Sequence, residues 1–296
     1  MVGKSISFYI NKEKIKIISP NRKELDLMNY KKVSNYFKEN KIDYIINCAA
    51  KVAGILENLN NQISFYRENI DINHNLIKCA YENKIKNFIN MGSSCMYPST
   101  YNKKINEKKL MSGPLEKSNL GYGMAKVSSS IYLELIRMET GFNYSTIIPC
   151  NLYGPNDNFE KDKSHLIASI IKKVNNAKIY NKKFIEVWGK GEVKREFLYV
   201  DDLAIFITKL IKNNSKLPAF LNVGYGKDFS VTTYYQKIMK AYNYKVDLKY
   251  DHSKPNGVNR KLMDSKIAKK EYGFKINTKL EEGIKKTINY YEKNYL

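Results

Sequence analysis

Short apolar runs alternate with amphipathic helical stretches over the first two-thirds of the chain. The runs are a few residues long and rich in β-branched side chains, which is typical of strands buried on both faces. Strands are expected at Lys14–Ser19, Asp43–Ala49, Asn87–Met91 and Tyr144–Ile148. Helices are expected at 31–40, 63–82 and 122–140. Because strands that alternate with helices are joined by crossovers, the pattern predicts an α/β fold with a doubly wound parallel sheet.

The pattern loosens after Pro155, where less regular elements follow one another. The expected elements are helix 164–177, strand 184–188, helix 201–212, strand 220–223, and helices 232–242 and 280–293. We interpret them as a smaller α/β substrate-binding lobe whose segments interleave with late elements of the main sheet. The predicted main domain is 1–155 with a contribution from about 197–226, and the predicted lobe is 156–196 with 227–296.

The formal net charge of +22 favours anionic partners, either a nucleic acid or a negatively charged substrate. The lysines are spread along the whole chain among Asn, Glu and Tyr, which indicates solvated faces rather than one basic stripe. No nucleic-acid-binding module is recognisable, so a nucleic-acid partner is not expected. No apolar run approaches the roughly 20 residues that span a bilayer, and no signal-peptide pattern precedes the first element. We expect a cytoplasmic protein without a membrane partner.

The four cysteines lie far apart, without a paired C-x-x-C. They are Cys48, Cys79, Cys95 and Cys150. This spacing predicts neither a disulfide framework nor a zinc site, and no metal is expected.

Tyr122 and Lys126 form a Y-x-x-x-K spacing inside a helical pattern, so their side chains share one helix face. An ammonium beside a phenol favours the phenolate and lowers a pKa that is ordinarily about 10. Such a tyrosine can exchange a proton with a substrate oxygen near neutral pH. Tyrosine and lysine are both abundant here, so the spacing alone is a weak signal.

Small polar residues end the strand that is expected at Asn87–Met91. In open α/β sheets the ligand crevice lies at the carboxyl ends of the strands, where the Ser93 hydroxyl could orient a carbonyl. Serines also simply end strands. The order of strand, serine-rich end and downstream Y-x-x-x-K favours the catalytic interpretation.

Several motifs occur in a fixed order along nearly the whole chain. They are AAKVAG at 49–54, GSSCMYP at 92–98, Y-x-x-x-K at 122–126, NLYGPNDNF at 151–159, SH at 164–165, VWGKG at 187–191 and REFLYVDD at 195–202. Together they resemble the GDP-L-fucose synthase family of extended short-chain dehydrogenases. The resemblance implies a Rossmann sheet that binds NADPH, and a GDP-sugar as substrate.

The resemblance implies epimerisation at C3 and C5 and reduction at C4 of GDP-4-keto-6-deoxy-mannose, giving GDP-L-fucose for surface polysaccharide. It implies that Tyr122 donates a proton, that Lys126 holds the nicotinamide ribose, and that Ser93 binds the substrate carbonyl. Cys95 and His165 match the family's epimerisation residues, because a thiolate and an imidazolium can act on the acidic protons beside a ketone. The alternatives are a small buried side chain for Cys95 and a helix-start residue after an N-cap Ser164 for His165.

Two further sets of residues match ligand-binding positions of the family. The cofactor set is Gly3, Arg22, Ala49, Ala50, Met91, Gly92, Ser93, Ser94, Lys126, Pro149, Cys150, Asn151, Leu152 and His165. The substrate set is Lys173, Trp188, Arg195, Asn256 and Lys261. Arg22 matches an arginine that binds the adenosine 2′-phosphate, although an exposed loop arginine is the alternative. Asn256 stands where the family has an aspartate. Surface cations and a core tryptophan are the alternatives for the substrate set.

The resemblance breaks at the N-terminus. The family begins with a strand followed by a G-x-x-G-x-x-G loop that holds a pyrophosphate, whereas Met1–Gly3 corresponds only to the end of that loop. Because a missing central strand would leave backbone groups unpaired, we expect an incomplete sequence rather than a truncated remnant. The alternatives in function are an enzyme of another nucleotide sugar, in a GDP-colitose or GDP-heptose pathway, and an inactive, cofactor-deficient protein. A homodimer through two helices per subunit is expected from the family.

Overall fold

The computed structural model describes residues 1–101, 103–160, 164–254 and 257–296. Four parallel strands form its main sheet in the order β1-β2-β3-β7. They are β1 (Tyr44–Asn47), β2 (Asn87–Met91), β3 (Asn143–Pro149) and β7 (Phe220–Val223). The strands run in register, with Ile45 opposite Phe88 and Phe88 opposite Tyr144. The expected α/β class with a parallel sheet is confirmed.

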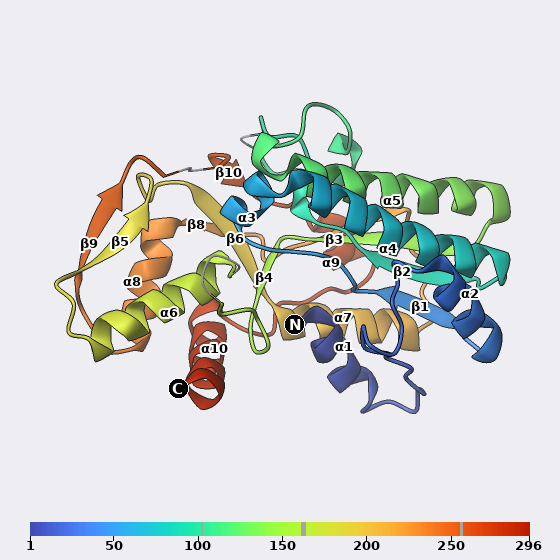
Figure 1. Cartoon of the computed structure of the whole chain (residues 1–296), viewed down its shortest axis with the longest axis horizontal. Helices are drawn as coiled ribbons and strands as arrows, with labels where there is room; N and C mark the ends of the chain where they lie inside the picture. Colours follow the sequence, from blue (N-terminus) through green and yellow to red (C-terminus); the bar gives the residue numbers. More distant parts are fainter. Residues whose placement is uncertain (102, 161–163, 255–256) are drawn as a thin grey trace.

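Helices cover both faces of this sheet (Figure 1). On one side lie α2 (Tyr30–Glu39), α4 (Gln62–Glu82) and α5 (Leu120–Thr140). On the other side α1 (Val2–Ile10) packs against α7 (Val200–Lys212). The helix ends follow local chemistry: the Asn29 side chain accepts the Lys32 N–H and starts α2, and α5 ends at Gly141 with φ 72°.

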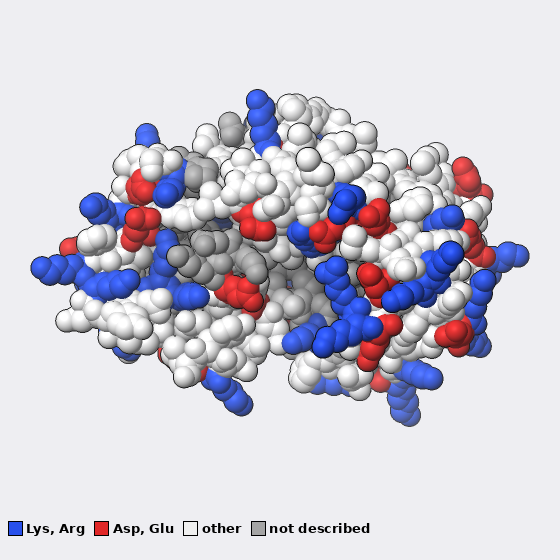
Figure 2. Space-filling model, viewed as in Figure 1, with Lys and Arg blue, Asp and Glu red and all other residues white. Residues whose placement is uncertain are grey.

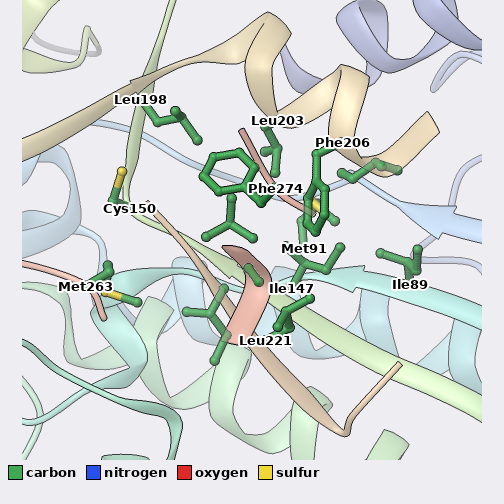
Figure 3. Packing of buried hydrophobic residues seen from close by; sticks show 14 of the residues in the cluster. Ile89, Met91, Ile147, Cys150, Leu198, Leu203, Phe206, Leu221, Met263 and Phe274 are labelled. Atoms are coloured by element: carbon green, nitrogen blue, oxygen red, sulfur yellow. The ribbon is translucent and has the colours of Figure 1, made fainter. Parts of the chain in front are cut away.

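The main core lies between the sheet and α7. Met91, Ile147 and Leu221, from three neighbouring strands, are buried beside Phe206 of α7 (Figure 3). The Phe206 ring meets Phe274 edge to face at 5.1 Å between centroids. Such contacts fix the strand positions, and hence the ends from which the site residues emerge.

A second, smaller part of the molecule is built from two short sheets. One contains β4 (Asn151–Tyr153), β6 (Lys194–Tyr199) and β10 (Arg260–Lys261), with β8 (Asp228–Ser230) antiparallel to β6. The other pairs β5 (Phe184–Trp188) with β9 (Asp247–Asp251). The helices α6 (Leu166–Ile179), α8 (Val231–Ala241) and α10 (Leu280–Tyr295) lie beside them (Figure 1). Ile171, Tyr234 and Ile284 belong to one buried cluster there, separate from the main core.

The described residues also form short elements. They are α3 (Ile55–Asn60), α9 (Lys266–Lys270) and the 3₁₀ turns η1 (Ser94–Met96), η2 (Glu107–Lys109) and η3 (Lys117–Asn119).

The expectation of a strand at Lys14–Ser19 was wrong. Ile15 and Ile17 pack against the main core, but the segment forms no ladder with any described strand. A strand needs a partner for its ladder hydrogen bonds, and no described strand pairs with this segment. Within the described sheet β1 pairs with β2 alone and is an edge strand.

The lysines and arginines are dispersed. In Figure 2 they are scattered over both parts of the visible face and interrupted by acidic and neutral residues. Some form surface ion pairs, such as Lys237 with Glu281 at 2.5 Å and Lys286 with Glu282 at 2.8 Å. This face carries no continuous basic stripe among its described residues, in agreement with a solvated lysine-rich surface.

None of the helices in the described parts of the chain has the length and apolar character needed to cross a membrane.

Candidate active site

A cavity of about 1020 Å³ lies where the main sheet meets the smaller part of the molecule. Its inner wall includes Ser93 and Cys95, which follow β2, and Tyr122 of α5. Trp188 of β5 and Arg195 of β6 line the same cavity. Two groups of predicted site residues, separated by up to a hundred positions in sequence, therefore face one space.

A tight turn after β2 presents Ser93 to the cavity. A side chain at Gly92 would place its Cβ 2.8 Å from Thr146 Cγ2 and 2.9 Å from Met96 Sδ, so only glycine fits there. Ser93 Oγ then accepts the Cys95 N–H at 3.2 Å and caps η1. This turn brings the hydroxyl of Ser93 and the thiol of Cys95 to the same cavity wall.

Tyr122 and Lys126 lie one turn apart on α5, as the spacing predicts. Lys126 Nζ is buried, donates to the Met91 carbonyl at 2.8 Å, and lies 5.9 Å from the centre of the Tyr122 ring. Burial lowers the pKa of Lys126 to about 8.

The expectation that Lys126 lowers the pKa of Tyr122 was wrong for this structure. Burial raises the pKa of Tyr122 well above its ordinary value, the charge of Cys95 raises it further, and the Ser93 hydrogen bond only partly offsets this. The ammonium of Lys126 points to a carbonyl instead of the phenol oxygen. A tyrosine in this state is protonated at neutral pH and suits proton donation.

His165 faces the same cavity and is paired with a buried carboxylate. Its Nδ1 lies 3.3 Å from Asp157 Oδ1, and the Asp157 side chain is 4% exposed. Burial acts to lower the pKa of His165, but the hydrogen bond and charge of Asp157 leave it above its ordinary value. His165, and not Ser164, is the N-cap of α6, and its ring makes no capping bond to a described residue.

Sequence reasoning gave Asp157 no role, although it lies inside the NLYGPNDNF motif. Its Oδ2 is buried without a hydrogen-bond partner among the described residues. The sequence held one clue to this pair, because a carboxylate stands eight residues before the predicted catalytic histidine. The structure also adds Asn119 and Glu116, which line the cavity beside Cys95.

The predicted substrate residues occupy two places. Where β5 lines the cavity, Lys173 Nζ lies 5.4 Å from the Trp188 ring and donates to the Glu186 carbonyl at 2.9 Å. Lys261 is instead buried against Glu116 at 2.9 Å, so it is not a surface cation. Arg195 Nη1 donates to the Val258 carbonyl at 2.6 Å. Asn256, the remaining predicted substrate residue, lies outside the described residues.

Most predicted cofactor residues cluster at the carboxyl ends of β1, β2 and β3. Ala49 and Ala50 follow β1, Met91 and Gly92 end β2, and Pro149 ends β3, with Cys150, Asn151 and Leu152 after it. Gly3, in the first turn of α1, lies beside Cys48, with 3.6 Å between the position of a Cβ on Gly3 and Cys48 Cβ. The cavity itself reaches Ser93, Ser94, Asn151 and His165 of this set.

A dinucleotide fits this edge of the sheet. The first turn of α1 has no side-chain cap from any described residue, so its backbone amides are available to a pyrophosphate. The Nζ of Lys126, from α5, donates to the Met91 carbonyl at this edge, where it could bind ribose hydroxyls. Arg22 is exposed and contacts Met28 Sδ at 3.8 Å, and its binding of a 2′-phosphate stays a prediction.

In the described part of the chain, no group of three or more His, Cys, Asp and Glu side chains is arranged to hold a metal ion.

Comparison with known proteins agrees with this geometry. Residues 1–224 match the NAD dependent epimerase/dehydratase family. A GDP-L-colitose synthase from Yersinia pseudotuberculosis is 42% identical over 99% of this chain and 96% of its own length. A GDP-L-fucose synthase from Azorhizobium caulinodans is 34% identical over 98% of this chain and 93% of its own length. The solved structure of a GDP-mannoheptose C4 reductase from Campylobacter jejuni, with NADP bound, superposes with a TM-score of 0.88 at 28% identity, covering 98% of this chain and 95% of that one.

The chain therefore belongs to the NAD dependent epimerase/dehydratase family. Within that family it is a GDP-L-fucose synthase-like enzyme, as the sequence motifs predict.

Proposed function

We propose that the enzyme uses NADPH to convert GDP-4-keto-6-deoxy-mannose to GDP-L-fucose, by epimerisation at C3 and C5 and reduction at C4. The observation that carries this proposal is the meeting of Ser93, Cys95, Tyr122 and His165 on one cavity. A reductase alone needs the serine and the tyrosine. The thiol and the imidazole add an acid–base pair suited to inverting centres beside a ketone.

Each residue has a separate task in this reaction. Cys95 takes the proton from a carbon next to the C4 carbonyl, and His165 returns a proton to that carbon. Ser93 donates a hydrogen bond to the C4 oxygen, and Tyr122 protonates that oxygen during reduction. Bound NADPH supplies the hydride, and Lys126 holds its ribose. The cytoplasm stays the expected location, and surface polysaccharide the expected destination of the product.

A second candidate is the same chemistry on another GDP-sugar. It is favoured by the 42% identity to a GDP-L-colitose synthase and by the likeness to a heptose C4 reductase. The names of these two relatives state sugars other than fucose.

Turnover in deuterated water tests the proposal. With GDP-4-keto-6-deoxy-mannose and NADPH, we expect GDP-L-fucose that carries solvent deuterium at C3 and C5, detected by NMR. Cys95→Ser should lose this label, whereas Cys79→Ser, at a buried cysteine outside the cavity, should keep it. Reduction without label at C3 and C5 would reject the epimerase roles. Calorimetry with NADPH separates an inactive, cofactor-deficient protein from an enzyme that was given the wrong sugar.

We also propose a homodimer through α4 and α5, whose outer faces carry exposed apolar side chains. Ile63 of α4 is 83% exposed, and Met138 and Leu135 of α5 are 75% and 50% exposed. Such a set is costly to leave in water and is typical of an interface.

Replacing Ile63 and Met138 together by Glu should shift the sedimenting mass from dimer to monomer, because the charges would be buried in the interface. Phe184→Glu is the matched control, because Phe184 is 48% exposed but lies on β5, in the smaller part of the molecule. A monomeric wild type, or an unchanged double variant, would contradict this interface.

A further inference from the structure

Buried charged side chains surround the Cys95 thiol. Lys261 Nζ lies 3.9 Å from Cys95 Sγ and 2.9 Å from Glu116 Oε2. The side chains of Lys261 and Glu116 are 8% and 11% exposed. Asn119 Nδ2 lies 3.8 Å from the same sulfur. The thiol therefore contacts an ion pair and an amide rather than an apolar pocket.

Arg195 brings a second cation to this group. A Cβ on Gly257 would lie 3.0 Å from Arg195 Nη2 and 3.1 Å from Glu116 Oε1, so the guanidinium and the carboxylate border one small space. Arg195 and Cys95 also interact electrostatically. Among the described residues, the charged and titratable groups that face Cys95 are Lys261, Arg195, Glu116 and the phenol of Tyr122.

The charges nearest the sulfur favour its anionic form. The closest cation is Lys261, whose Nζ lies 3.9 Å from Cys95 Sγ, whereas the Glu116 carboxylate is held by that same Nζ. An adjacent ammonium stabilises a thiolate relative to a neutral thiol.

The directions of two pKa shifts agree with a charged ion pair. Burial acts to raise the pKa of Glu116, but Lys261 holds it below its ordinary value. Burial acts to lower the pKa of Lys261, but Cys95 and Glu116 raise it above its ordinary value.

We propose that Lys261 and Glu116 are positioning residues for Cys95, in which Lys261 stabilises the thiolate and Glu116 fixes Lys261 against the sulfur. This inference rests on the proposed function, where the thiolate is the base that removes the sugar proton. It gives Lys261 a different task from the substrate binding that the family resemblance implied. The same lysine acts on the protein's own base before any substrate arrives.

Alkylation of Cys95 by iodoacetamide measures this effect directly, because the thiolate is the reactive form. The other cysteines interfere little, since burial raises the pKa of Cys48 to about 12, that of Cys79 to about 11, and that of Cys150 well above its ordinary value. The rate at Cys95 is followed from pH 5 to 10 by peptide mass spectrometry, without sugar or NADPH.

Lys261→Met should move the midpoint of the rate–pH curve upward by about one unit and slow alkylation near neutral pH about tenfold. Lys261→Arg, which keeps the charge, should stay within about threefold of wild type. Glu116→Gln keeps a side-chain oxygen that can accept the Lys261 hydrogen bond, so Lys261 stays beside the sulfur. It removes the anion that opposes the thiolate, so the midpoint should move downward. Lys270→Met, at an exposed lysine of α9 outside the cavity, is the matched control and should leave the curve unchanged.

Opposite shifts for the Lys261→Met and Glu116→Gln variants are the signature of the proposal. Shifts in the same direction, or no shift in either, would overturn it and leave the pair a purely structural contact. If Lys261→Met fails to fold by circular dichroism, Lys261→Arg and Glu116→Gln still decide the question. Because alkylation needs no substrate, its result is independent of the deuterium experiment that judges the proposed function.

Discussion

Replacing Tyr122 by Phe is expected to slow reduction at C4 by roughly 10²–10⁴-fold, the usual effect of removing a general acid. The raised pKa of the buried phenol keeps the proton on Tyr122 at neutral pH, so the wild-type side chain is ready to donate it. Phe retains the ring and its packing but has no proton to give. Oxidation of NADPH, followed at saturating substrate, measures the loss.

The same variant should continue to exchange deuterium at C3 and C5, because Cys95 and His165 are unchanged. Tyr132→Phe removes one hydroxyl from the same helix, away from the cavity, and should leave both steps within a few-fold of wild type. A Tyr122→Phe enzyme with a reduction rate near that of wild type would mean that another group protonates the C4 oxygen. Loss of exchange as well as reduction would point to a collapsed site instead of a missing proton donor.

The longest and most periodic elements were predictable from the sequence. The helices expected at 63–82 and 122–140 correspond to α4 and α5, and the run at 87–91 is β2. The two helices bury an apolar stripe and the strand buries a continuous apolar run. Local pattern and tertiary packing therefore favour the same structure in these segments. The division into domains at Pro155 rests on such patterns as well and stays a prediction.

Elements that depend on distant partners were not predictable from local pattern. The segment 14–19 has a strand-like composition but forms no strand, because strand formation needs a neighbouring ladder. Conversely, β9 at Asp247–Asp251 has a polar sequence and was not expected, yet it pairs with β5 along its full length. β-structure is decided by what lies beside a segment, which a single local pattern does not contain.

The candidate site, too, was predictable only in the part that local motifs carry. Motif order pointed to Ser93, Cys95, Tyr122 and His165, and the structure brings all four to one cavity. The sequence analysis gave no role to the two acidic groups that pair with site residues. Glu116 and Asp157 are acidic side chains whose value depends entirely on the side chain that they meet, Lys261 in one case and His165 in the other. Their roles stay predictions until the variants are measured.

Replacing Asp157 by Asn is expected to lower the pKa of His165 and to slow epimerisation by roughly 10²-fold, since the carboxylate both orients and charges the imidazole. In the wild type, Asp157 raises this pKa against the effect of burial, which lowers it. Without the carboxylate the lowering effect of burial remains. The imidazolium is then lost at a lower pH, and the alkaline limb of the pH–rate curve for deuterium exchange should move to lower pH.

Proton NMR titration measures the pKa of His165 directly. This pKa would not change if Asp157 had only a structural role. The chain has three histidines, so the His165 signals can be assigned from a His165→Gln spectrum, with His74 and His252 as internal references. Asp43→Asn, at an exposed aspartate outside the cavity, is the matched control and should leave all three titrations unchanged. If Asp157→Asn slows exchange but leaves the pKa of His165 in place, Asp157 acts only by holding the loop, where it also accepts the Asn158 N–H at 2.8 Å. If the pKa falls and exchange keeps its wild-type rate and pH profile, His165 is not the acid of the epimerisation.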